Sequence, residues 1–144
     1  MQAQAKSTVM IAYDRSKISD KSFEEGIRIA RESNSSLYIT GICSKYQVLR
    51  DRPWDITPFD LMQDDLIALF KIGQSNGVNV DGKILIDPSI LDVAELITRV
   101  RATRIVCVCT RESNGKSAKN TDLLANAAQS TGVPVTVITL DSVD

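Results

Sequence analysis

The sequence predicts a doubly wound α/β fold of one domain, residues 1–144, in which helices cover both faces of a five-stranded parallel sheet. Five short apolar runs alternate with four segments of helical periodicity, in the order β-α-β-α-β-α-β-α-β. The length of 144 residues is enough to bury a core of two or three layers, and 43% of the residues are hydrophobic. No internal repeat, linker or low-complexity segment interrupts the alternation. Right-handed crossovers then leave few possible topologies.

The five expected strands are runs of β-branched and other apolar residues, which are typical of strands buried on both faces. They are 7–13 (STVMIAY), 35–43 (SSLYITGIC), 78–86 (VNVDGKILI), 104–109 (RIVCVC) and 133–140 (VPVTVITL). An irregular connection over 45–57, which contains Pro53 and Trp54, follows the second strand. Long irregular loops are often functional, so this one is a candidate lid or partner contact, although the sequence names no ligand for it.

The four helices between the strands are expected from apolar residues at helical spacing. Their inward faces are Phe23, Ile27 and Ala30; Met62, Leu66, Leu69 and Ile72 or Gly73; Ile90, Val93, Ala94, Ile97 and Val100; and Leu123, Leu124, Ala127 and Ala128.

Composition excludes several classes of function. The net charge is −1 and the charges are interleaved, so no basic face indicates nucleic-acid binding. No apolar run approaches membrane-spanning length, and the first residues lack the pattern of a signal peptide. The three cysteines (Cys43, Cys107 and Cys109) lie in apolar runs, which indicates reduced core thiols in a cytoplasmic protein. Histidine is absent, which removes imidazole bases and most transition-metal sites, so we expect no metal.

In a doubly wound fold, ligands bind beyond the carboxyl ends of the strands, where the strand order reverses. The candidate loops are therefore 14–19, 43–46 and 110–119. The last contains TRESNGKS (110–117), which ends like a phosphate-binding P-loop. However, Thr110 stands where a P-loop has its first glycine, and the segment follows the fourth strand instead of the first. A phosphotransferase that uses this Gly-Lys-Ser is kept as an alternative.

Over essentially its whole length the chain resembles the universal stress protein family. The resemblance rests on VMIAYDRSKISDKSFEEGIRIARESNSSLYITGI (9–42), ILDVAELITRVRATRIVCVCTR (90–111) and GVPVTVITL (132–140). It implies a flavodoxin-like, Rossmann-like sheet of order 3-2-1-4-5. It also implies a homodimer, commonly paired along the last strand, with a role in stress tolerance and no defined reaction. We therefore expect no catalytic residue, and an unidentified regulatory protein as partner.

Many members of that family bind ATP through Gly-x-x-Gly, about nine residues, then Gly-Ser or Gly-Thr after the fourth strand. In this sequence the glycine positions fall at Cys109, Glu112 and near Thr121-Asp122. Every glycine is replaced, and Glu112 and Asp122 bring negative charge to the expected phosphate position. We expect a degraded nucleotide site that does not bind ATP in the usual mode, and no cofactor.

The alternative is a member that binds ATP or AMP. Asp14 matches the family's adenine- or ribose-reading acid and Ser16 its neighbour, while the backbone near Cys43 would also contact adenine. The candidates on the phosphate side are Thr110, Gly115, Lys116, Ser117 and Thr121. Asp14 has an equally good explanation as an organiser of its own loop, through an Asx turn or a helix cap.

The last strand is the candidate dimer interface. Its alternating members are Val133, Val135, Val137 and Thr139, and the strand carries no protective lysine. An apolar edge of this kind favours pairing with a second chain. Ordinary burial by the flanking helices is the alternative.

Overall fold

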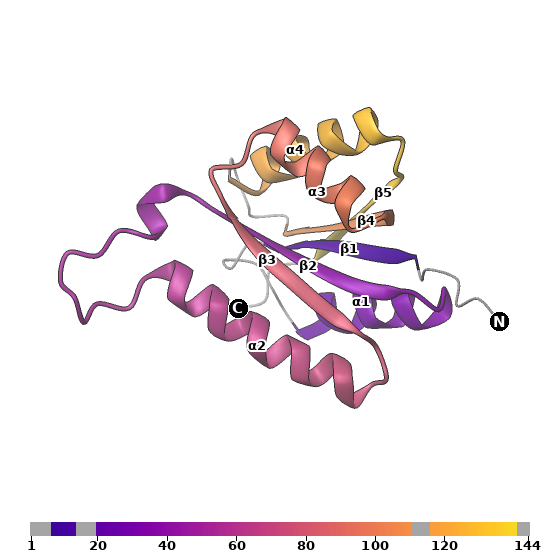
Figure 1. The fold of residues 1–144 in the computed structure, drawn as a ribbon, viewed down its shortest axis with the longest axis horizontal. Helices are drawn as coiled ribbons and strands as arrows, with labels where there is room; N and C mark the ends of the chain where they lie inside the picture. The colour runs from indigo at the N-terminus through magenta and orange to yellow at the C-terminus, as the bar shows by residue number, and fades with distance from the viewer. Residues whose placement is uncertain (1–6, 14–19, 111–115, 141–144) are drawn as a thin grey trace.

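The structure is a computed structural model that describes residues 7–13, 20–110 and 116–140 (Figure 1). The strands are β1 (Thr8–Tyr13), β2 (Ser36–Cys43), β3 (Val80–Ile86), β4 (Ala102–Thr110) and β5 (Val135–Leu140). The helices are α1 (Asp20–Glu32), α2 (Pro58–Ser75), α3 (Ile90–Arg99) and α4 (Lys116–Thr131), with a short 3-10 helix at Lys45–Gln47.

The five strands form one parallel sheet in the order β3-β2-β1-β4-β5. This confirms the predicted fold class and strand order. The order reverses between β1 and β4, because β2 and β3 are added on one side of β1 and β4 and β5 on the other. β3 and β5 are therefore the two edges of the sheet.

Helices α1 and α2 cover one face of the sheet, and α3 and α4 cover the other (Figure 1). The core on the α1–α2 side is built around Ile11, Phe23, Ile39 and Met62. The core on the α3–α4 side contains, among others, Met10, Val93, Ile97, Ile105 and Leu124. Both cores are mainly apolar, as the buried-strand pattern predicts, although Thr40 of β2 is also fully buried.

Two helices begin with complete capping boxes. Thr57 accepts a hydrogen bond from the backbone N–H of Asp60, and the Asp60 carboxylate accepts one from the N–H of Thr57. Ser89 and Asp92 repeat the arrangement at α3. Each box satisfies two N–H groups that have no partner within the helix, which determines where the helix starts.

Some boundaries and faces differ from the prediction. β4 begins at Ala102, and β5 begins at Val135, so that Val133 lies before the strand. Of the two alternatives for the inward position at the end of α2, Gly73 is buried and Ile72 is exposed. Ile90, which was expected to face inward, is exposed, whereas Leu96 is buried. Ile90 is the first residue of α3, and one further turn is needed before the helix reaches the sheet.

The connection from β2 to α2, residues 44–57, extends away from the body of the molecule, and we call it the arm (Figure 1). The prediction of an irregular connection is confirmed for most of it, with one 3-10 turn near its start. None of the helices in the described part of the chain is both long and apolar enough to span a membrane.

Candidate functional site

At the point where strand order reverses, the described strands end at different levels, an offset that we call the recess. Tyr13, the last residue of β1, pairs with Gly41, and β2 continues to Cys43. β2 therefore extends two residues beyond the end of β1, or about 6–7 Å at the usual rise of a strand.

The other neighbour of β1 extends equally far. Ala12 pairs with Cys107, and β4 continues to Thr110, two residues beyond the level of Tyr13. The end of β1 is thus set back between the ends of β2 and β4. In doubly wound folds, ligands bind outside the carboxyl ends of the strands at this point of reversal.

The predicted nucleotide contacts that the structure describes belong to the end of β4 and the start of α4. Thr110 ends β4, Lys116 and Ser117 are the first two residues of α4, and Thr121 follows in its second turn. The first N–H groups of an α-helix have no partner within the helix, and its start is the positive end of the helix dipole, which favours an anion. Asp14, Ser16 and Gly115 lie outside the described residues.

Cys43 closes the β2 side of the recess, but its side chain does not line an open surface. The thiol is buried in the core on the α1–α2 side, and its carbonyl oxygen accepts a hydrogen bond from the N–H of Asp87 at 2.9 Å. Burial raises the pKa of this thiol, and the nearby Asp87 carboxylate raises it further. The thiol is therefore protonated at neutral pH and is a poor nucleophile.

Asp87 is a structural residue that the sequence reading did not single out. It has a positive φ of 44°, in the left-handed region that Asp tolerates better than most residues. Its carboxylate accepts a hydrogen bond from the N–H of Lys45 at 3.0 Å, so it ties the start of the arm to the end of β3. The Asp-Pro sequence at 87–88 is the signal that could have marked this turn.

The β5 edge, the predicted dimer interface, pairs with β4 from Ile105–Val135 onward. The side chains of Val133 and Val135 are half-buried against the core on the α3–α4 side. On the opposite face Thr136 is half-buried and accepts hydrogen bonds from the Arg104 guanidinium at 3.1 and 3.2 Å. The helices therefore leave part of β5 uncovered. Val137 and Thr139 follow in the strand, and their side chains are not described.

Within the described ranges, no three His, Cys, Asp or Glu residues come together in a way that could hold a metal ion. The chain has no histidine, so any ligand set would have to be built from carboxylates and thiols.

No family model matches the sequence, and no curated protein matches it. Solved structures do match. A universal stress protein from Archaeoglobus fulgidus is 17% identical, with a TM-score of 0.59, over 92% of this chain and 93% of that one. The fold is that of the universal stress proteins.

Two further structures of this fold contain nucleotides. A universal stress protein in complex with cAMP is 17% identical, with a TM-score of 0.60, over 94% of this chain and 98% of that one. A family protein from Arabidopsis thaliana with AMP bound is 18% identical, with a TM-score of 0.54, over 92% of this chain and 90% of that one. The nucleotides belong to those two proteins. What this chain shares with them is the fold.

Proposed function

We propose that this chain is a cytoplasmic regulatory or protective protein of the universal stress type, whose nucleotide site has lost ATP binding in the usual mode. The observation that carries the proposal is the replacement of glycine by Cys109 and Glu112 in the segment that leaves β4 beside the recess. The role then depends on dimerisation and on a protein partner, with no catalytic residue.

The physical reason lies in how a phosphate is held. Glycines let the backbone N–H groups approach phosphate oxygens closely, and any side chain at those positions occupies that space. The carboxylates of Glu112 and Asp122 add repulsion. Two like charges about 4 Å apart repel by about 4 kcal/mol at an effective dielectric constant of about 20. Lys116 offers one compensating positive charge.

Thermal unfolding with and without nucleotide tests the proposal. The wild-type melting temperature is expected to stay unchanged in millimolar ATP with Mg²⁺. Cys109→Gly/Glu112→Gly restores the two leading glycines and is expected to gain stability from ATP. Ligand at 100 times its Kd stabilises by about 2.7 kcal/mol, which for a chain of this size is roughly 5–10 °C. A comparable rise in the wild type would contradict the loss of ATP binding.

A second candidate function is binding of an AMP-type nucleotide, and the cAMP and AMP complexes of the neighbouring structures favour it. A single phosphate needs fewer N–H donors than a triphosphate, and the start of α4 with Lys116 and Ser117 supplies some. If the chain binds an AMP-type nucleotide, we expect AMP and cAMP, but not ATP, to raise its melting temperature, and we expect Asp14→Ala to abolish this rise. An equal response of wild type and Asp14→Ala would assign the binding to another surface.

The proposed dimer pairs the β5 edges of two chains. Support comes from the half-buried Val135 and Thr136, which the chain's own helices do not cover completely. Light scattering on the wild type is expected to give twice the monomer mass of 15.8 kDa.

An enzyme that uses Gly-Lys-Ser for phosphoryl transfer is the remaining rival. It requires nucleotide turnover that Lys116→Ala abolishes. We expect no turnover in the wild type.

A further inference from the structure

The exposed large apolar side chains of the described residues gather at one edge of the molecule. Seven of the nine lie in two short segments, and the other two, Ile67 and Ile72, lie on α2. The seven are Tyr46, Leu49, Trp54 and Ile56 in the arm, and Ile86, Ile90 and Leu91 where β3 passes into α3. Exposed apolar residues that cluster in this way mark interaction surfaces more often than scattered ones do.

The two segments are joined at their base. The N–H of Asp87 donates to the Cys43 carbonyl at 2.9 Å, and the Asp87 carboxylate accepts from the N–H of Lys45 at 3.0 Å. The start of the arm and the end of β3 are therefore one continuous edge, on the β3 side of the sheet. This edge is opposite to β5, so pairing through β5 leaves it free.

The arm is braced in its extended position. The Arg50 guanidinium binds both carboxylate oxygens of Asp60 at 2.6 Å and also donates to the carbonyl of Asp55 at 2.5 Å. The Asp55 carboxylate accepts from the N–H of Arg52 at 3.0 Å. These bonds hold the arm while Trp54 remains 73% exposed. Because the arm is already fixed by these bonds, it loses little conformational entropy when Trp54 binds a partner.

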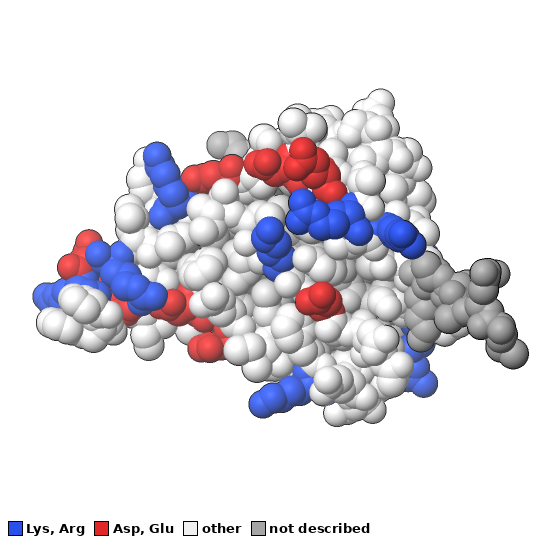
Figure 2. Space-filling view, in the orientation of Figure 1, with Lys and Arg blue, Asp and Glu red and all other residues white. Residues whose placement is uncertain are grey.

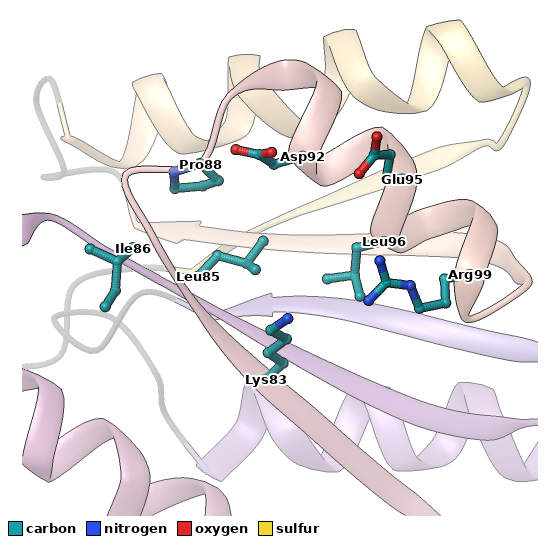
Figure 3. A pocket seen from close by; sticks show the side chains of 8 residues that line it. All are labelled: Lys83, Leu85, Ile86, Pro88, Asp92, Glu95, Leu96 and Arg99. Atoms are coloured by element: carbon teal, nitrogen blue, oxygen red, sulfur yellow. The ribbon is translucent and has the colours of Figure 1, made fainter.

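A hollow of about 220 Å³ lies between β3 and α3, and Figure 3 shows the side chains that line it. Leu85 and Leu96 form its apolar floor, and the head groups of Lys83 and Arg99 are directed into the space between strand and helix. Neither cation has an ion pair or hydrogen bond among the described residues.

The opposite rim of the hollow is acidic. It is formed by Asp92 and Glu95 on α3, and Figure 2 shows acidic and basic side chains in neighbouring rows over this part of the surface. An apolar floor beside unpaired cations suits an aromatic side chain, because a cation is attracted to the face of the ring. The acidic rim suits a neighbouring arginine, and Arg52 lies two residues before Trp54 in the arm.

We propose that Trp54 of one chain inserts into the β3–α3 hollow of a second copy, while the partner's arm fills the hollow of the first. Each chain carries both the protrusion and the hollow at the same edge, as a two-fold interface requires. Trp54 does not line the hollow of its own chain, and among the described residues it remains exposed. The contact is independent of the β5 pairing and would join two β5 dimers, or two single chains.

Trp54 is the chain's one tryptophan, so selective excitation reports on it alone. We expect its emission to move to shorter wavelength as protein concentration rises, at the same concentrations at which sedimentation shows a gain in mass. Trp54→Ser is expected to weaken this association roughly tenfold or more, as central tryptophans of interfaces do. The matched control is Ile67→Ser, which removes an apolar side chain that is 52% exposed on α2 and should associate like wild type.

Mixing two defective variants identifies the occupant. Lys83→Glu/Arg99→Glu removes the cations of the hollow but keeps Trp54, while Trp54→Ser keeps the hollow. The mixed pair has one intact contact, so the mixture should associate more tightly than either variant alone. Circular dichroism confirms that each variant is folded, and Val135→Glu repeated in each background separates this edge from β5.

Three results would overturn the proposal. One is an emission maximum that does not change with concentration in the wild type, and this measurement needs no variant. Another is association of Trp54→Ser equal to wild type. The third is a mixture no tighter than its components, which assigns the arm to a different partner.

Discussion

Met62 and Gly41 provide a sharp test of the packing between α2 and the sheet. Met62 is fully buried, and its terminal methyl group lies over Gly41 of β2. A Cβ atom added at Gly41 would be 2.8 Å from Met62 Cε and 3.2 Å from Ile84 Cγ1. The first distance is shorter than packed carbon atoms adopt, so Gly41→Ala forces the methionine to move.

The magnitudes follow from these contacts. Overpacking a core costs about 1–3 kcal/mol, offset by about 0.5–1 kcal/mol because alanine is more favourable than glycine in a strand. Met62→Ala leaves a cavity and costs about 2–5 kcal/mol. In the double variant the new methyl group occupies space that the methionine has left. We therefore expect the double variant to be about 1–2 kcal/mol more stable than the two single effects predict together.

Urea denaturation of the wild type, both single variants and the double variant measures this coupling. Gly41→Ala combined with Val93→Ala is the control, because Val93 is equally buried but lies in the core on the other face of the sheet. That pair should be additive within about 0.3–0.5 kcal/mol. The reasoning is falsified if the Gly41/Met62 pair is equally additive.

Three further outcomes can be measured. Thr57→Ala removes the cap of α2 and should lower the free energy of unfolding by about 1 kcal/mol in denaturant melts, and an unchanged value would show that the cap is redundant. The Arg50 guanidinium, and then the N–H of Thr57, lower the pKa of Asp60 from 3.8 to about 2. Its stabilisation is thus complete above the unfolded pKa of 3.8 and lost as the pH falls through about 2, so the stability difference between wild type and Asp60→Asn should shrink over that window. A difference that stays constant from pH 5 to pH 2 would contradict this assignment. Val135→Glu combined with Trp54→Ser, which also removes the proposed arm contact, should give monomers in light scattering, and a folded dimer that persists in this variant would rule out β5 pairing.

The order of strands and helices was predictable because each element carries its own periodicity. The run VMIAY in β1 and the spacing of Phe23, Ile27 and Ala30 in α1 are local signals, and the structure confirms both elements. The capping boxes at Thr57 and Ser89 are also local, since each needs only an acidic residue three positions later.

Features that depend on how segments far apart in the sequence come together were not predictable in the same way. The recess at the end of β1 depends on the register of three strands, and nothing within Thr8–Tyr13 states how far β2 and β4 continue beyond it. The spacing in α2 allowed Ile72 or Gly73 as the inward residue, and it is Gly73 that packs against Val80 of β3. Ile90 has the right spacing for an inward face but is the exposed first residue of α3. Periodicity gives the direction of a side chain but not whether another element lies there to cover it.

The hollow and the arm illustrate the same limit. Lys83 and Arg99 are 16 positions apart in the sequence, and only the crossover from β3 to α3 brings them to one cavity. The sequence indicates that Trp54 lies in an irregular loop, whereas its exposure and the bond between Arg50 and Asp60 are seen only in the structure.

The division of the core between the two faces has a consequence for synthesis on the ribosome. The layer on the α1–α2 side takes all its buried residues from the first 78 positions of the chain except Val106. That layer can assemble once β3 has emerged, while the opposite face of the same strands, with Met10 and Ile42, still has no helices to cover it. Domains are synthesised from the N-terminus at about 5–20 residues per second, so this apolar face of the sheet stays exposed to water for seconds. The nascent chain should be most prone to aggregation, and most dependent on a chaperone, after β3 has been synthesised and before α4 has emerged from the ribosome.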